Sequence, residues 1–233
     1  MHSGRCKMTS AVRGVRGIGG IGAIGAVRAV RVRAILADPD GDEAYGTMPT
    51  LITFDPGGTT GWCVMQVHPE ALSEPGYTVL DNVEHWAQGQ ITGAESRQIH
   101  EMAVLVAAWP GAAVVSEDFQ LATSVGGHDV LSPVRINGGL AYALWLQNRG
   151  IMLQNRSDRM IANDDRLKAW GFYVREGGAE HARDATRHAL VWWRKCRGPS
   201  AKAREMRATS WPMFYGIDGR LLKRKNGRKK VEM

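Results

Sequence analysis

The sequence predicts an α/β fold, in which a mixed β-sheet carries helices on both faces. Two observations lead to this prediction. Short apolar runs of strand length alternate along the chain with segments whose apolar residues recur at helical spacing. Turns containing glycine or proline separate these segments. Elements that alternate in this way pack as layers around one core. The predicted order is three strands, a helix, a strand, a helix, a strand and two helices.

The first half of the chain supplies four of the five predicted strands. Residues 51–55 (LITFD) and 61–67 (GWCVMQV) predict two strands joined by a glycine turn, and a third lies within 77–91. Three early strands imply an antiparallel meander. Residues 94–109 predict a helix that is packed by one face, and residues 112–119 (AAVVSEDF) predict the next strand. The buried face of that helix is formed by Ile99, Met102, Val106 and Trp109.

The second half begins with a helix for which Ser132 is the expected N-cap and Pro133 the first-turn proline, and which runs towards Arg149. Three further elements follow: a short strand in 151–154, a short helix in 164–173 and a strong final helix in 179–195. The pair Gly138-Gly139 lies inside the helix that begins near Ser132. It indicates close packing against another backbone, for example at a dimer interface.

The charge of the chain is unevenly distributed. Residues 1–36 carry a net charge of +7 and residues 194–233 a net charge of +10, whereas the part between them carries −10, within a formal total of +7. We expect a low-complexity, disordered leader in 1–47, a folded domain in 48–195 and a basic extension in 196–233. Basic ends attract a polyanion such as DNA, and acids gathered in the body suit a metal site.

Cysteine content and hydropathy indicate the setting. The three cysteines, Cys6, Cys63 and Cys196, are far apart and odd in number, so they predict neither a disulfide framework nor a thiolate zinc site. No apolar stretch approaches the length that spans a bilayer. We therefore expect a soluble protein without a membrane partner, acting in the cytoplasm.

Three carboxylates occupy positions that packing alone would not choose. Asp55 closes the first strand, Glu117 interrupts an apolar run, and Asp184 lies on the final helix, three residues after His181 and on the same face. Buried charges are costly unless they are paired or bound to a cation. A divalent metal such as Mg²⁺, which prefers oxygen ligands, would allow the acids to converge. His188 lies one turn further along this face, and we interpret it as a structural or phosphate-facing residue.

The motifs FDPGGTTGW (54–62), VVSEDF (114–119) and HARDATRHAL (181–190) together resemble RuvC-like Holliday junction resolvases of the RNase H-like nuclease superfamily, particularly those of actinobacterial phages. The resemblance covers roughly residues 50–195. It implies an RNase H-like, five-stranded mixed sheet flanked by helices on both faces. It also implies an endodeoxyribonuclease, acting as a homodimer in a bacterial or phage-infected cell, that resolves branched DNA and leaves 5′-phosphates.

The resemblance also implies a set of site residues. Asp55, Glu117, His181 and Asp184 would hold two Mg²⁺ ions, for which Mn²⁺ can substitute. Independently of the resemblance, we expect Gly57 and Gly58 to permit the tight turn after Asp55. His181 would serve either as a ligand or to position the attacking water.

Basic residues outside these motifs are candidates for DNA contacts. The expected phosphate contacts are Arg156, Arg159, Arg166, Lys168, Lys223, Arg224 and Lys225, with solvated surface residues as an equal alternative for the first four. Trp211, Phe214 and Tyr215 lie between basic clusters of the extension and are candidates for stacking on unpaired bases, although a simple disordered tail is nearly as well supported.

Three other functions fit parts of the same pattern. A nuclease of this fold could cut flaps or RNA–DNA hybrids, because loops decide the substrate. DPGGTTG also resembles the first phosphate loop of the actin, Hsp70 and sugar-kinase superfamily, in which Thr59 and Thr60 would contact a nucleotide. The second loop of that superfamily is missing here. A silent DNA-binding module is disfavoured, because all four expected metal-site residues are present.

Overall fold

The computed structural model describes residues 48–119, 131–175 and 179–222, and the predicted leader, 1–47, lies outside this part. At its centre is a five-stranded sheet with the strand order β3-β2-β1-β4-β5. The strands are β1 (Thr50–Asp55), β2 (Thr59–Val67), β3 (Val83–Thr92), β4 (Ala113–Asp118) and β5 (Met152–Asn155). β1, β2 and β3 are antiparallel, whereas β4 and β5 run parallel to β1. This arrangement is RNase H-like, and the predicted fold class is confirmed.

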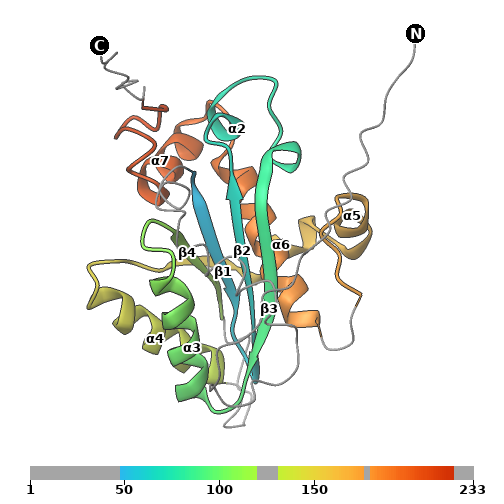
Figure 1. Ribbon diagram of the computed structural model, residues 1–233, viewed down its shortest axis with the longest axis vertical. Helices are drawn as coiled ribbons and strands as arrows, with labels where there is room; N and C mark the ends of the chain where they lie inside the picture. The colour runs from blue at the N-terminus through green and yellow to red at the C-terminus, as the bar shows by residue number, and fades with distance from the viewer. Residues whose placement is uncertain (1–47, 120–130, 176–178, 223–233) are drawn as a thin grey trace, which may run out of the picture.

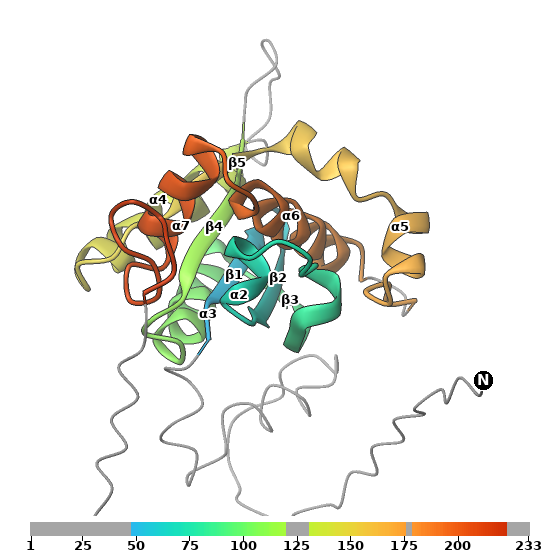
Figure 2. The ribbon, with the colours of Figure 1, turned by 90° about the horizontal axis from the view of Figure 1, so that it is seen from above.

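Helices cover both faces of the sheet (Figure 1, Figure 2). α3 (Glu95–Ala107) and α4 (Ser132–Trp145) lie on one face, and α6 (Glu180–Cys196) and α7 (Ala201–Ser210) lie on the other. The shorter elements are α2 (Glu70–Ser73), η1 (Leu80–Asn82), η3 (Arg156–Ile161) and α5 (Asp164–Ala169).

Successive side chains of the central strand, β1, point alternately into two apolar cores on opposite faces of the sheet. Ile52 and Phe54 of β1 pack against α3 and α4, whereas Leu51 packs against α6. Odd-numbered residues of β1 therefore face α6. The same parity holds in β4, where Val114 belongs to the core under α3 and α4 and Val115 to the core under α6.

The helices of the α3 and α4 face largely follow the predicted patterns. Met102, Val106 and Trp109 are buried, and Ile99 packs against the same core, as predicted. The predicted N-cap of α4 is wrong. Leu131 already has helical backbone angles and is the N-cap residue, so Ser132 lies inside the helix, with the proline in the first turn as expected.

Of the two adjacent glycines in α4, Gly139 has a steric reason to be a glycine. A Cβ built on it would lie 2.5 Å from Cδ1 of Ile99 in α3, whereas a Cβ on Gly138 would meet nothing within 4 Å. The close approach is therefore between two helices of the same chain.

The first part of the basic extension is folded against the domain. Trp211 and Tyr215 are each 1% exposed, and the ring of Trp211 stacks on Trp193 of α6 with centroids 4.5 Å apart. Arg207 of α7 is also buried and donates to the carbonyl oxygens of Leu72, Cys196, Gly198 and Gly219.

Burial corrects the interpretation of the aromatic residues as base-stacking groups. Trp211, Phe214 and Tyr215 all lie in the core under α6, so they are not available to unpaired bases. The domain boundary at residue 195 stays a prediction, but residues 201–221 pack against the same core as the preceding domain. Within the described residues, no helix combines the length and apolarity needed to cross a membrane.

Candidate metal centre

Two carboxylates lie at the ends of the two central parallel strands. Asp55 is the last residue of β1, and Glu117 is the penultimate residue of β4. Thr53, two residues before Asp55, donates its hydroxyl to the carbonyl oxygen of Ala185 in α6 over 2.6 Å. Because side chains alternate along a strand, Asp55 points to the same side. The two acids are only 5% and 7% exposed, so they are desolvated and held at fixed points under α6.

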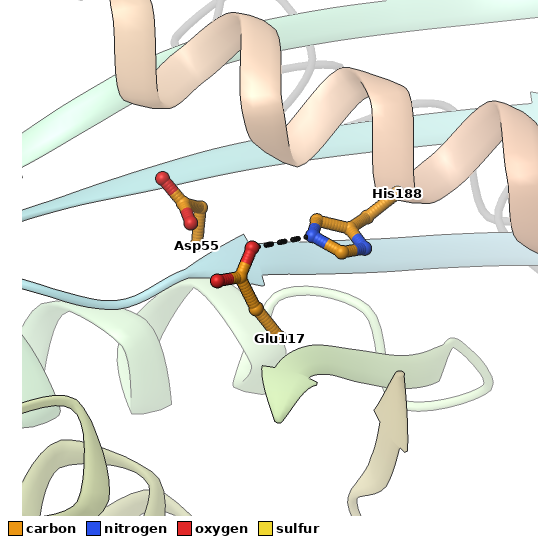
Figure 3. A group of neighbouring side chains, drawn as sticks. All are labelled: Asp55, Glu117 and His188. Carbon is orange, nitrogen blue, oxygen red and sulfur yellow. Dashed lines mark hydrogen bonds and ion pairs between the residues drawn. The ribbon is translucent and has the colours of Figure 1, made fainter. Parts of the chain in front are cut away.

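α6 adds a third acid and two histidines to this spot. His181, Asp184 and His188 are three and four residues apart, which places them along one face of the helix. His181 Nδ1 donates to Asp55 Oδ2 over 2.8 Å, and His188 Nε2 donates to Glu117 Oε2 over 2.8 Å. Figure 3 shows His188 reaching from α6 towards Glu117, with Asp55 beside them. Each strand carboxylate is thus oriented by its own histidine.

Gly61 allows α6 to come this close to the sheet. Gly61 of β2 is paired with Asp55 in the register of β1 and β2. A Cβ built on Gly61 would lie 1.9 Å from the carbonyl oxygen of His181, a distance that no real side chain could accept. Gly57 and Gly58 were expected to permit the tight turn, but neither has a positive φ and neither would clash if it carried a Cβ. The motif therefore needs its last glycine for packing.

A single guanidinium lies among the three acids. Nη1 of Arg159, from η3, is 3.6 Å from Asp55 Oδ1, 3.2 Å from Glu117 Oε2 and 2.6 Å from Asp184 Oδ2. Arg187 of α6 also binds Asp184 through its other carboxylate oxygen. The negative charge of the cluster is thus balanced by cations from two different elements.

The other residues predicted to contact DNA lie in different surroundings. The side chain of Arg156 is 66% exposed, and its Nε lies 3.7 Å from Glu117 Oε1. In α5, Arg166 donates to the carbonyl oxygen of Ile161, and Lys168 pairs with Asp165 at 3.5 Å. The remaining three, Lys223, Arg224 and Lys225, lie outside the described residues. A role in DNA binding stays a prediction for all seven.

The local charges favour the ionised form of Glu117. Burial alone would raise the pKa of Glu117, but the hydrogen bond and charge of His188, together with Arg159 and Arg156, lower it overall. The hydrogen bond to Asp55 raises the pKa of His181, and burial opposes this only in part. Glu117 is therefore an anion at neutral pH, as a metal ligand must be.

This cluster fits a divalent cation. Asp55, Glu117 and His188 each offer one ligand atom, and these atoms lie within 4.8 Å of one another. Carboxylates are ligands that Mg²⁺ and Mn²⁺ prefer, whereas an imidazole is more typical of transition metals such as Zn²⁺. Arg159 already acts as a stand-in cation for the acids. The buried cluster is thus compatible with metal binding, and the identity of the ion as Mg²⁺ stays a prediction.

The structure brings all four predicted site residues together, but their contacts differ. Asp55 and Glu117 belong to the group that could share an ion, whereas His181 pairs with Asp55 and Asp184 pairs with two arginines. His188, interpreted from the sequence as structural or phosphate-facing, completes the group. Its spacing of seven residues from His181 was the signal available in the sequence. The roles of the four predicted residues as ligands stay a prediction.

The hydroxyls of the first motif do not form an open phosphate loop. Thr60 is fully buried and its hydroxyl donates to Oε1 of Gln98 in α3, whose amide nitrogen in turn donates to the carbonyl oxygens of Gly58 and Gly93. Thr60 therefore packs the turn against α3 and is not free to contact a nucleotide. This removes one of the two threonines on which the nucleotide-binding alternative rested.

Comparisons with known proteins found similarity only at the level of solved structures. No protein-family model and no curated protein matches the chain. The structure of RuvC from Thermus thermophilus in complex with a Holliday junction substrate is similar, with 13% identity and a TM-score of 0.46 over 61% of this chain and 91% of that one. A second structure of the same organism's RuvC shows 14% identity and a TM-score of 0.43, over 61% and 92% of the two chains. The fold assignment rests on the strand order and does not depend on these similarities.

Proposed function

We propose that this protein is a Mg²⁺-dependent endonuclease that hydrolyses phosphodiester bonds in branched DNA, such as a Holliday junction. One observation carries the proposal. Three acids from β1, β4 and α6 converge around a single positive group on an RNase H-like sheet. A buried cluster of this kind costs folding free energy unless a cation compensates it. Such a cluster is better explained by a reaction that needs a cation than by stability.

Each residue of the cluster has a role in this proposal. Asp55, Glu117 and His188 would hold the metal, with Asp184 at its edge. Bound Mg²⁺ would supply Lewis-acid stabilisation of the charge that develops on the scissile phosphate. The side chain of His181 is 43% exposed and hydrogen-bonded to Asp55, so it is placed to take a proton from a water that enters from solvent. His188 is fully buried and holds Glu117 in place.

The choice of substrate rests on the sequence motifs. FDPGGTTGW, VVSEDF and HARDATRHAL together resemble resolvases of the RuvC type, including those of actinobacterial phages. A four-way junction has two symmetric strands to cut, which favours a homodimer. Arg156, Arg166 and Lys168 lie on the η3 and α5 segment and would bind phosphates of the same DNA.

Cleavage of a substrate panel tests this proposal. Junction, flap, RNA–DNA hybrid and linear duplex are incubated with the protein and Mg²⁺, and the products are mapped for nicks with 5′-phosphates. We expect junction cleavage, and we expect Glu117→Gln and Asp55→Asn to lower its rate by roughly 10³-fold, the scale of losing a group that stabilises transition-state charge.

Glu101→Gln is the matched control for these variants. It makes the same chemical change in α3, on the other side of the sheet, where Glu101 pairs with Arg97, and it should cleave at the rate of the unmodified protein. Undiminished cleavage by Glu117→Gln and Asp55→Asn would overturn the assignment. Cleavage of only flaps or hybrids would keep the nuclease and change its substrate.

A further inference from the structure

One nitrogen atom of Arg159 contacts all three acids of the cluster. The guanidinium Nη1 lies within 3.6 Å of oxygens of Asp55, Glu117 and Asp184, which come from three different elements. A cation that bridges these carboxylates has to lie close to the same point. Arg159 therefore occupies space that a metal ion shared by the acids would need.

The other nearby arginines do not duplicate this position. Arg187 binds Asp184 and Asp164 but pairs with neither Asp55 nor Glu117, and Arg156 is close only to Glu117. Without Arg159, no cation would lie between the three carboxylates, which are each at most 7% exposed, and the remaining arginines would each pair with only one of them. The guanidinium of Arg159 is therefore the positive charge that compensates all three carboxylates at once.

Arg159 is also placed so that it can leave. It lies on η3, a short helix at the edge of the fold beside α6, and its side chain is 18% exposed. Arg156, three residues earlier in the same helix, already has a largely exposed side chain. A rotation of the Arg159 side chain towards Arg156 would free the carboxylates without unfolding a strand or α6.

We propose that Arg159 is an internal counter-ion that is exchanged for the metal: uptake of a divalent cation displaces its guanidinium from the three acids, and the displaced guanidinium then binds a phosphate of the DNA. This inference rests on the proposed function and adds a regulation to it. Metal and guanidinium compete for the same oxygens, so Arg159 weakens metal binding in the absence of DNA. DNA offers the guanidinium another anion, so DNA and metal strengthen each other's binding reciprocally.

Mn²⁺ affinity, measured by calorimetry on the full chain without DNA, tests the exchange. We expect Arg159→Gln to bind Mn²⁺ at least about tenfold more tightly than the unmodified protein, because the loss of one charge-assisted contact is on that scale. Arg159→Lys keeps a competing charge and should lie between the two. Arg97→Ala, on α3 at the other face, is the control and should leave the affinity unchanged.

The possible outcomes separate this inference from the proposed function. Equal or weaker Mn²⁺ binding by Arg159→Gln would overturn the exchange and leave the nuclease proposal standing. Absence of Mn²⁺ binding in every variant would overturn both.

A second measurement covers the case in which Arg159→Gln does not fold in the absence of Mn²⁺. Saturating Mn²⁺ should then restore its thermal unfolding transition, because the metal replaces the missing charge and stabilises the folded state by mass action. A variant that stays unfolded in Mn²⁺ would overturn the exchange.

Binding of the displaced Arg159 guanidinium to DNA is tested separately. Repeating the Mn²⁺ titration with a bound, uncleaved junction carrying non-hydrolysable linkages should raise the affinity of the unmodified protein more than that of Arg159→Gln. An equal increase in both would show that DNA does not receive the displaced guanidinium, and would overturn that step.

Discussion

The face of the sheet under α3 and α4 is closed almost entirely by apolar side chains, whereas the face under α6 holds the charged groups. Among the described residues, the buried acidic and basic side chains all lie on the α6 side: Asp55, Glu117, Asp184, His188 and Arg207. The buried polar groups opposite, such as Thr60, Gln98 and Ser116, are neutral and hydrogen-bonded. Both faces therefore have an apolar core, and only the face under α6 spends part of its stability on a charged site.

The difference between the two faces arises from the alternation of side chains along β1 and β4 and from the position of α6 over the ends of these strands. The ends of β1 and β4 lie beside each other because the two strands are parallel, and their odd-numbered residues face α6. α6 crosses these ends with its first three turns, which carry His181, Asp184 and His188. A change on the α3 and α4 face should consequently affect stability alone, and a change under α6 should affect the chemistry.

The largest expected effect on stability comes from the apolar face. Leu140 of α4 is fully buried, so Leu140→Ala should lower the free energy of unfolding by about 2–5 kcal/mol through lost burial and a cavity. Mn²⁺ affinity at a temperature where the variant is folded should stay unchanged, whereas Glu117→Gln should lower it at least about tenfold. Denaturant unfolding and calorimetry measure the two quantities. An equal loss of Mn²⁺ affinity in both variants would contradict the division between the faces.

A smaller effect is expected where α6 touches the sheet. Gly61→Ala should cost about 1–3 kcal/mol, because the new methyl group overlaps the backbone of His181 and forces α6 outwards. Its matched control is Gly58→Ala, where the new methyl group meets nothing and the change should stay within about 0.5 kcal/mol. Gly61→Ala should also slow cleavage, since His181 moves away from Asp55. Similar melting temperatures for the two variants would show that the helix does not depend on this contact.

The smallest effect concerns the two thiols of the core between α6 and the sheet, Cys63 of β2 and Cys196 of α6. Burial raises the pKa of Cys63 and of Cys196 to about 12 each. At pH 8 only about one thiol in 10⁴ would then be ionised, and the thiolate is the reactive form. In a Cys6→Ser background, iodoacetamide should label neither residue in the native protein and both after denaturation, as read by mass spectrometry. Rapid native labelling of Cys63 would show that the core under α6 opens readily.

The sequence was sufficient for the fold and for part of the site. Asp55 and Glu117 stand out because a charge at the end of an apolar strand is unfavourable without a partner. The parallel pairing of their strands was not predicted beyond the mixed sheet, because the order of elements does not show which strand lies beside β1; the structure pairs β1 with β4. The burial of Trp211 and Tyr215 was missed because a basic, aromatic tail has the same composition whether it packs or binds DNA.

His188 and Arg159 were harder to assign for a different reason. Their roles depend on which side chains of α6 and η3 meet the strand ends, and this is decided by distances in the folded chain. The close approach of α6 is set by Gly61, which was interpreted as part of a turn and strand start. Arg159 looked like a surface phosphate contact because nothing local in the sequence shows that three acids surround it.

Crystallographic location of Mn²⁺ tests the central claim most directly. Anomalous diffraction from crystals grown with Mn²⁺ should show a peak at coordination distance, about 2.1 Å, from oxygens of both Asp55 and Glu117. Nη1 of Arg159 should have moved away from the carboxylates. Absence of a peak at these two acids, with Arg159 still bound to all three carboxylates at saturating Mn²⁺, would contradict the account.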